Sequence, residues 1–318
     1  ISEYLYPPTF LPLFGALARL PYDAARTLWL GLYALVYLAA FAALAMGLPR
    51  AERLTFAGLG ALLTATSFPL LLHIRNGQAD VLVIGLALLS FSLYGRGKRG
   101  ASALLLALAG LLKVSPLLLL IYYLLYLRDW RYTLAVLAAG VGLAGISLLA
   151  VPFHYYPEYV MYILPVVSGG TGYYLNQSLL KYLADNPLLA QGVSAAGLGL
   201  FALFAGWAGS QQRRADGFET TAAFILNLLV ILVFQGKAWS MAYVWAILPC
   251  ALVLTYLLHH AAKPWQLLAA GAASALMVAK IYGYPPLDSL NLLGALVMGG
   301  LLMVVCWPRT TKENGGVA

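Results

Sequence analysis

Long apolar runs separated by short polar segments constrain this chain more than any other feature. Hydrophobic residues make up 62% of the sequence and charged residues 9%, whereas an ordinary soluble domain is about 25% charged. A water-soluble fold cannot bury that much apolar surface. A helix needs about 20 mostly apolar residues to cross the hydrocarbon core of a bilayer, and runs of that length recur along the chain. The sequence therefore predicts an all-α, polytopic integral membrane protein.

Nine apolar runs have the length of a membrane-spanning helix. They lie at residues 24–47, 54–74, 80–95, 133–152, 188–208, 219–235, 241–258, 265–282 and 290–307. An odd number of spans puts the two ends of the chain on opposite sides of the membrane. We expect one transmembrane domain over residues 1–318, with its C-terminus on the cytoplasmic side.

The apolar stretch at residues 101–127 differs from these runs because Lys113 and Pro116 interrupt it. Basic residues flank both of its ends: Arg96, Lys98 and Arg99 before it, and Arg128 and Arg131 after it. Both flanks should therefore lie on the cytoplasmic side. Because proline lacks an amide donor and disfavours helix just before it, we predict a re-entrant helical hairpin with Lys113 near the tip. The alternative is one long kinked span with the Lys113 side chain reaching the interface.

The other basic residues also fall in short clusters between apolar runs, within a net charge of +8. This distribution orients membrane spans and does not indicate a nucleic-acid-binding surface. The predicted outer segments, rich in Tyr, Trp, Pro and Gly, are residues 1–23, 75–79, 153–187, 236–240 and 283–289. Membrane lipids are the first expected partners, and an aromatic belt at the interface accounts for part of this composition.

Disulfide and metal chemistry are not indicated by the sequence. The only cysteines, Cys250 and Cys306, both lie inside apolar runs, where a thiol usually packs as a small hydrophobe. No pair of carboxylates has a spacing suited to Mg²⁺. We expect neither a metal ion nor a cofactor.

A polar break between two apolar runs, residues 75–80, is the first candidate site. Ionisable groups beside a bilayer core are costly, so Arg75 and Asp80 suggest function. Five cations stand at the outer ends of predicted helices: Arg75, Lys113, Lys181, Lys237 and Lys280. Several of them could surround one anionic group such as a lipid phosphate. The alternative is that each cation reaches the interface or pairs with a nearby carboxylate, namely Asp80, Glu158, Asp185 or Asp288.

Five short motifs occur in a characteristic order. They are Tyr6-Pro7-Pro8, residues 76–80, residues 95–100, residues 109–116 and Asn176-Gln177-Ser178-Leu179. In this order the chain resembles the polyprenol-phosphate-mannose-dependent mannosyltransferases of glycosyltransferase family 87, which belong to the C-type membrane glycosyltransferases. The resemblance runs from Tyr6 to about Leu248.

The resemblance implies inverting transfer of a sugar, with mannose as the expected one, from a polyprenyl phosphate sugar to a glycolipid or lipid-linked glycan on the outer face of the membrane. It also implies a bacterial inner (cytoplasmic) membrane with the active face outward. A carboxylate would take the proton of the acceptor hydroxyl while the lipid phosphate leaves. Arg75, Lys113 and Lys237 would hold that phosphate. Gln78, Asn176, Gln177, Ser178 and Trp239 would bind sugar or acceptor.

Two departures from the family pattern bear on activity. The family's presumed catalytic aspartate lies upstream of the Tyr-Pro-Pro motif, so we expect that this chain lacks its first span and first outer loop, or that Glu3 or Asp80 takes the role. The family also commonly has histidine after the tryptophan that corresponds to Trp239, where this chain has Met241 and Ala242 nearby.

Three alternatives stay open at this point. Asp80 begins a predicted helix, where a carboxylate can serve as a purely structural cap. The whole chain could be a catalytically inactive relative that serves as a structural subunit beside a membrane-protein partner. A lipid or solute transporter is the third class, although it would need broken helices with polar groups near the midplane and, in many cases, an inverted repeat.

Overall fold

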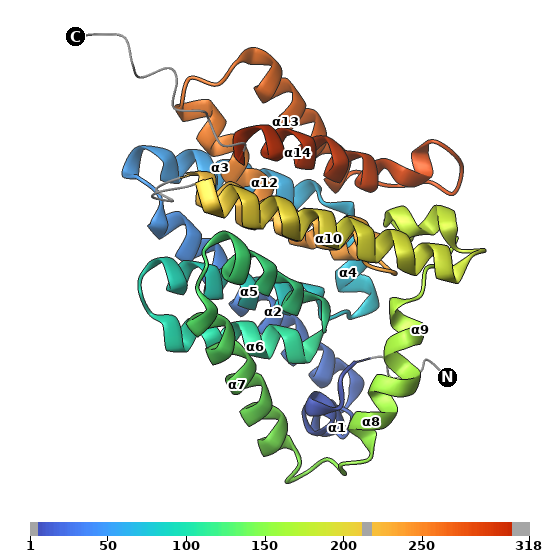
Figure 1. Ribbon diagram of the computed structural model, residues 1–318. Helices are drawn as coiled ribbons and strands as arrows, with labels where there is room; N and C mark the ends of the chain where they lie inside the picture. The colour runs from blue at the N-terminus through green and yellow to red at the C-terminus, as the bar shows by residue number, and fades with distance from the viewer. Residues whose placement is uncertain (1–5, 212–217, 307–318) are drawn as a thin grey trace.

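The computed structural model describes residues 6–211 and 218–306. Within them the chain forms fourteen α-helices and several short helical turns, with no β-strand (Figure 1). The helices are α1 (Leu11–Leu17), α2 (Tyr22–Gly47), α3 (Arg50–Thr66), α4 (Phe68–Asn76), α5 (Asp80–Gly95), α6 (Arg99–Leu112), α7 (Trp130–Ser147), α8 (Tyr155–Glu158), α9 (Leu164–Ser168), α10 (Pro187–Gln211), α11 (Phe218–Phe234), α12 (Val244–His259), α13 (Pro264–Val278) and α14 (Leu290–Cys306). The shorter turns are η1 (Pro8–Phe10), η2 (Ser115–Leu119), η3 (Tyr122–Tyr126), η4 (Tyr159–Ile163), η5 (Leu179–Leu183), η6 (Ser240–Tyr243) and η7 (Leu287–Ser289).

Five helical segments are long and apolar enough to cross a membrane, and a bent pair makes a sixth candidate among the described residues. The five are Tyr22–Gly47, Trp130–Ser147, Pro187–Gln211, Ser240–His259 and Leu287–Val304. The all-α, multi-pass membrane class is therefore confirmed. The count of nine spans stays a prediction, because α5, α11 and α13 have 16, 17 and 15 residues, fewer than the roughly 20 of a full span.

The predicted span at residues 54–74 is wrong as a single helix. It is the bent pair α3 and α4, which meet at an angle of 59°. Ser67 between them has an extended backbone, and its hydroxyl accepts the Leu70 amide at 3.1 Å as the cap of α4. Pro69 follows in the first turn of α4, where its missing N–H is harmless. Ser67 and Pro69 therefore start a new helix at this point, although the sequence around them is continuously apolar.

The segment at residues 101–127 turns back on itself in the structure and does not form one continuous helix. Its re-entrant placement in a membrane stays a prediction. Helix α6 forms the first arm, and η2 and η3 form an irregular return arm. Arg99 at the start and Asp129 just beyond the end form an ion pair of 2.9 Å. Lys113 lies at the turn with extended backbone, as predicted.

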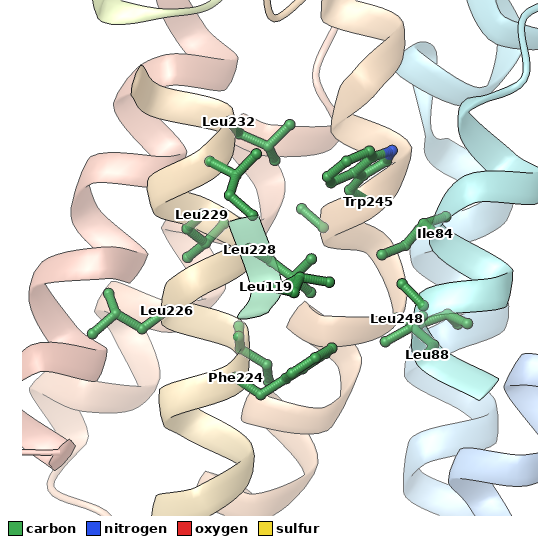
Figure 2. Packing of buried hydrophobic residues seen from close by; sticks show 14 of the residues in the cluster. Ile84, Leu88, Leu119, Phe224, Leu226, Leu228, Leu229, Leu232, Trp245 and Leu248 are labelled. Carbon is green, nitrogen blue, oxygen red and sulfur yellow. The ribbon is translucent and has the colours of Figure 1, made fainter. Parts of the chain in front are cut away.

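The core is built around α11 and α12. In the apolar window of α12, 78% of the residues are buried, compared with 22% in those of α2 and α10, so α12 is central and the other two are peripheral. Figure 2 shows side chains from α5, η2, α11 and α12 converging, among them Leu88, Leu119, Phe224 and Trp245. The return arm of the hairpin is therefore part of the core.

The loops gather at two ends of the helical bundle. Contacts at one end, the basic end, include Arg96 to the Ala43 carbonyl (2.7 Å) and Thr55 to His259 (2.9 Å). Contacts at the other, the Asp80 end, join residues 6–8, 77–80, 113, 171–178, 236–240 and 288–291. The predicted cytoplasmic and outer segments thus lie at different ends, and which end faces the cytoplasm stays a prediction.

Candidate functional site

An ion pair between Asp80 and Lys113 is the centre of the Asp80 end. Lys113 Nζ lies 2.7 Å from Asp80 Oδ1, and the two side chains are 23% and 4% exposed, respectively. Asp80 is the first residue of α5, and Lys113 follows α6 at the hairpin turn. Taking charges out of water costs several kcal/mol per ion, so the pair is weak evidence for stability and marks a candidate functional site. The partial exposure of Lys113 leaves the pair within reach of a ligand.

Asp80 is not the capping residue of α5, although it lies in the first turn as the structural alternative requires. Ala79 occupies the capping position of α5, and the helix start has no side-chain cap hydrogen bond. Gly77 ends α4 in the left-handed conformation (φ 63°) and lets the chain turn into α5. Asp80 thus stands in the first helical turn, where the dipole favours a carboxylate, and its direct partner is Lys113.

His73 is a site residue that the sequence analysis missed. Its ring is fully buried on α4, and Nε2 accepts the Val81 amide at 3.0 Å. A neutral ring that accepts at Nε2 carries its proton on Nδ1, and Nδ1 has no hydrogen-bond partner in the described part of the chain. The sequence did contain a signal for it, because His73 is an ionisable residue inside the apolar run that ends before Arg75.

The polar break at residues 77–79 is held by aromatic side chains. The Tyr6 hydroxyl donates to Gln78 Oε1 at 3.0 Å and accepts from the Ala79 amide at 3.2 Å. Trp29 donates to the Gly77 carbonyl at 3.0 Å, and the Tyr33 hydroxyl donates to the Gln78 carbonyl. Burial, and next the charge of Asp80, raises the pKa of Tyr6 to about 12, so its hydroxyl stays protonated at neutral pH.

The indole ring of Trp245, on α12, lies next to the Lys113 side chain. The Lys113 ammonium lies 5.8 Å from the centroid of the indole ring, within the range of a cation–π interaction. The indole Nε1 is buried and has no hydrogen-bond partner among the described residues. Helix α4, which carries His73, packs against η6 just before α12. Two unpartnered buried N–H groups therefore lie on elements that surround the Asp80–Lys113 pair.

The five cations predicted to surround one anionic group have different neighbours in this structure. Lys181 pairs with Asp288 at 2.8 Å, Lys237 donates to the Val166 carbonyl at 2.6 Å, and Lys280 lies over the Tyr282 ring at 5.2 Å. Arg75 is exposed at the end of α4 and makes no ion pair with a described residue. The alternative of local carboxylate pairing is confirmed for Lys113 and Lys181.

The predicted sugar-binding residues of the long outer loop are engaged with the protein. Asn176 donates to the Thr171 and Gly236 carbonyls at 2.9 and 3.2 Å, and Ser178 donates to the Gly236 carbonyl at 3.3 Å. Gln177 donates to the Asp288 carbonyl at 2.6 Å. All three are fully buried, and an antiparallel bridge joins Asn176 to Trp239. These side chains hold three loops of the Asp80 end together, whereas Gln78 and Trp239 stay partly exposed.

A groove of about 390 Å³ adjoins the site through Tyr6. Its walls come from the N-terminal turns and from α8 and η4, and α1 lies beside α8 in Figure 1. The lining is largely aromatic and includes Tyr6, Tyr155, Tyr159 and Tyr162, with Glu158 as its only carboxylate among the described residues. The groove can hold an apolar chain next to the polar break.

Two expectations concern other parts of the chain. Glu3 lies outside the described residues. Met241 and Ala242, near the position where the family pattern has histidine, are buried in η6. In the described part of the chain, no three His, Cys, Asp or Glu side chains are grouped so that they could hold a metal ion.

Comparison with known proteins gives one match. The family model described as Glycosyltransferase family 87 matches residues 4–236, a range that contains Tyr6, His73, Asp80, Lys113 and Gln177. No curated protein and no solved structure matches the chain. Because the matched range covers well over half of the sequence, the chain belongs to glycosyltransferase family 87, a family of polytopic membrane glycosyltransferases.

Proposed function

We propose that this protein transfers a sugar, by inversion, from a polyprenyl phosphate sugar to a glycolipid or lipid-linked glycan on the outer face of the membrane. The family match supports glycosyl transfer, and mannose is the sugar that the motif order favours. The observation that carries the proposal is the Asp80–Lys113 pair, a partly accessible ion pair at the tip of the hairpin.

In this mechanism Lys113 holds the donor phosphate. Its ammonium has three N–H donors, so it can donate one hydrogen bond to Asp80 and another to a phosphate oxygen at the same time. The acceptor hydroxyl oxygen attacks the anomeric carbon, and the bond from that carbon to the phosphate oxygen breaks. The electron pair leaves with the lipid phosphate, whose charge Lys113 stabilises. Asp80 takes the proton of the hydroxyl.

The other proposed roles come from the resemblance to the family. Arg75 and Lys237 would add positive charge for the phosphate, and Gln78 and Trp239, both partly exposed, would contact the sugar or the acceptor. Asn176, Gln177 and Ser178 would act through the loops that they hold together. The tyrosine-lined groove beside Tyr6 offers a path for a polyprenyl chain.

The proposed membrane arrangement puts the Asp80 end outside. The chain would cross a bacterial inner membrane nine times, with residues 101–127 entering as a re-entrant hairpin and the C-terminus in the cytoplasm. The basic residues gathered at the opposite end support this orientation, because Lys and Arg favour cytoplasmic loops.

The test is transfer of radiolabelled mannose from polyprenyl phosphate mannose to endogenous lipids in membranes that contain the protein. We expect Lys113→Ala and Asp80→Asn each to lower the rate by about 100-fold or more, as loss of a group that stabilises transition-state charge does. Lys98→Ala removes an exposed lysine at the basic end and should leave the rate unchanged. Equal rates for Lys113→Ala and the parent protein would contradict the proposal.

A catalytically inactive structural subunit is the second candidate. It is favoured by the internal hydrogen bonds of Asn176, Gln177 and Ser178 and by Met241 and Ala242 near the family's histidine position. A folded protein that transfers no mannose, glucose or arabinose from the corresponding donors would support this candidate. Co-purification of a membrane-protein partner would then be the next observation to seek.

A further inference from the structure

A second cavity lies at the basic end, away from the Asp80–Lys113 pair. It has a volume of about 940 Å³ and opens between the ends of α2, α5 and α12 and the starts of α3 and α11. Helix α5 has 16 residues and runs from Asp80 to this end, so about 24 Å separates the cavity from the proposed transfer site. Its inner wall is apolar and includes Leu44, Leu48, Phe91 and Leu252.

Glu52 is the unexplained group of this cavity. The residue is 7% exposed and lines the cavity, and its one ion-pair contact among the described residues is with His260. The nearest charge partner is His260, whose Nε2 is 3.8 Å from Glu52 Oε1, too far for a hydrogen bond. A buried carboxylate is stable only with positive charge or N–H donors close to it. The cavity therefore fits a ligand that brings an ammonium group.

Arg96 and an aromatic wall complete the cavity. One guanidinium N–H of Arg96 donates to the Ala43 carbonyl at 2.7 Å, which leaves up to four N–H donors, and the side chain is exposed at the cavity. Guanidinium groups favour phosphate oxygens. Phe218, Tyr256 and His260 stack in a row, with ring centroids 3.6 and 4.2 Å apart, and form one wall of the cavity.

We propose that this cavity binds a phospholipid whose head group carries a primary ammonium and a phosphate, as in phosphatidylethanolamine. The ammonium donates hydrogen bonds to Glu52, the phosphate contacts Arg96, and the acyl chains lie along Leu44, Leu48 and Phe91. The basic end, where positive residues gather, is the expected depth of lipid head groups. The assignment does not depend on the proposed transfer reaction.

Binding of defined lipids to the purified full chain in detergent, followed by native mass spectrometry, tests this site. The probes are phosphatidylethanolamine, phosphatidylcholine and phosphatidylglycerol with the same acyl chains. We expect phosphatidylethanolamine to bind about tenfold more tightly than the other two, because only its ammonium donates hydrogen bonds to Glu52. Glu52→Gln should remove this preference, and Arg96→Ala should weaken all three lipids.

Asp23→Asn, which neutralises an exposed carboxylate on α2, is the matched control and should keep the preference. Thermal unfolding of each variant checks that it is folded, and only folded variants are compared. Equal binding of the three lipids, or an unchanged preference in Glu52→Gln, would overturn the proposal. Equally tight binding of soluble phosphoethanolamine would overturn the lipid assignment, because acyl chains would then contribute nothing.

Discussion

At the scale of single residues, the buried polar groups at the Asp80 end divide into two kinds. Asp80 and Lys113 satisfy each other, and Asn176 and Ser178 are satisfied by backbone carbonyls. His73 Nδ1 and Trp245 Nε1, by contrast, have no hydrogen-bond partner in the described structure. Most buried polar groups in proteins are paired, so exceptions beside an ion pair indicate where a ligand or water is held.

His73 gives the prediction at this scale. His73→Phe keeps an aromatic ring against Tyr33, whose centroid is 4.9 Å away, but leaves the buried Val81 amide without an acceptor. We expect a loss of about 1–3 kcal/mol in the free energy of unfolding, measured by denaturant titration in detergent. His154→Phe changes an exposed histidine and should have little effect. A more stable His73→Phe protein would mean that the unpartnered Nδ1 costs more than the Val81 contact contributes.

At the scale of helical elements, the hairpin depends on small residues where its arms meet their neighbours. The return arm η3 packs against α10, and Gly209 is the contact point. A Cβ atom at Gly209 would lie 2.3 Å from the Tyr126 carbonyl oxygen and 2.8 Å from that of Leu125. Backbone atoms cannot move aside as a side chain can, so only glycine fits there without displacing η3.

Two glycine substitutions in α10 should therefore differ in their effect on stability. Gly209→Ala should lower the free energy of unfolding by about 1–3 kcal/mol, because it overpacks the contact with η3. Gly206→Ala, three residues earlier with open space around its Cβ position, should be neutral or stabilise the helix by up to about 1 kcal/mol. Denaturant titration of both variants in the same detergent is the measurement. Equal stability of the two would refute close packing of the hairpin on α10.

At the scale of the whole molecule, the separation of loops between two ends predicts which residues are reached from each side of the membrane. In a variant without native cysteines, Asp185→Cys should react with a membrane-impermeant maleimide in intact cells, because Asp185 is exposed in the long outer loop. Lys98→Cys, exposed at the basic end, should react only after the membrane is permeabilised. The reverse pattern would invert the proposed topology and move the Asp80 end to the cytoplasm.

The sequence by itself determined three things: that the protein is a membrane protein, that the described basic clusters lie at the same end of the bundle, and that the chain turns at Lys113. These follow from local properties, namely apolar run length, the sign of charge beside each run, and a lysine and a proline inside one. The motif order also indicated the family. Local signals of the same kind, the Ser67 cap and Pro69, were present for the break between α3 and α4 but were masked by continuous hydrophobicity.

Only the tertiary structure decided which groups meet. Lys113 pairs with Asp80 from 33 positions away, and Gln177 bonds Asp288 from 111 positions away. No periodicity or spacing encodes such partners, because they depend on how whole helices pack. His73 became a candidate for function for the same reason: a histidine is ordinary in a sequence, and it stands out only when the fold buries it and leaves Nδ1 without a hydrogen-bond partner in the described structure. Glu52 stands out because the fold places this nearly buried residue in the wall of a cavity.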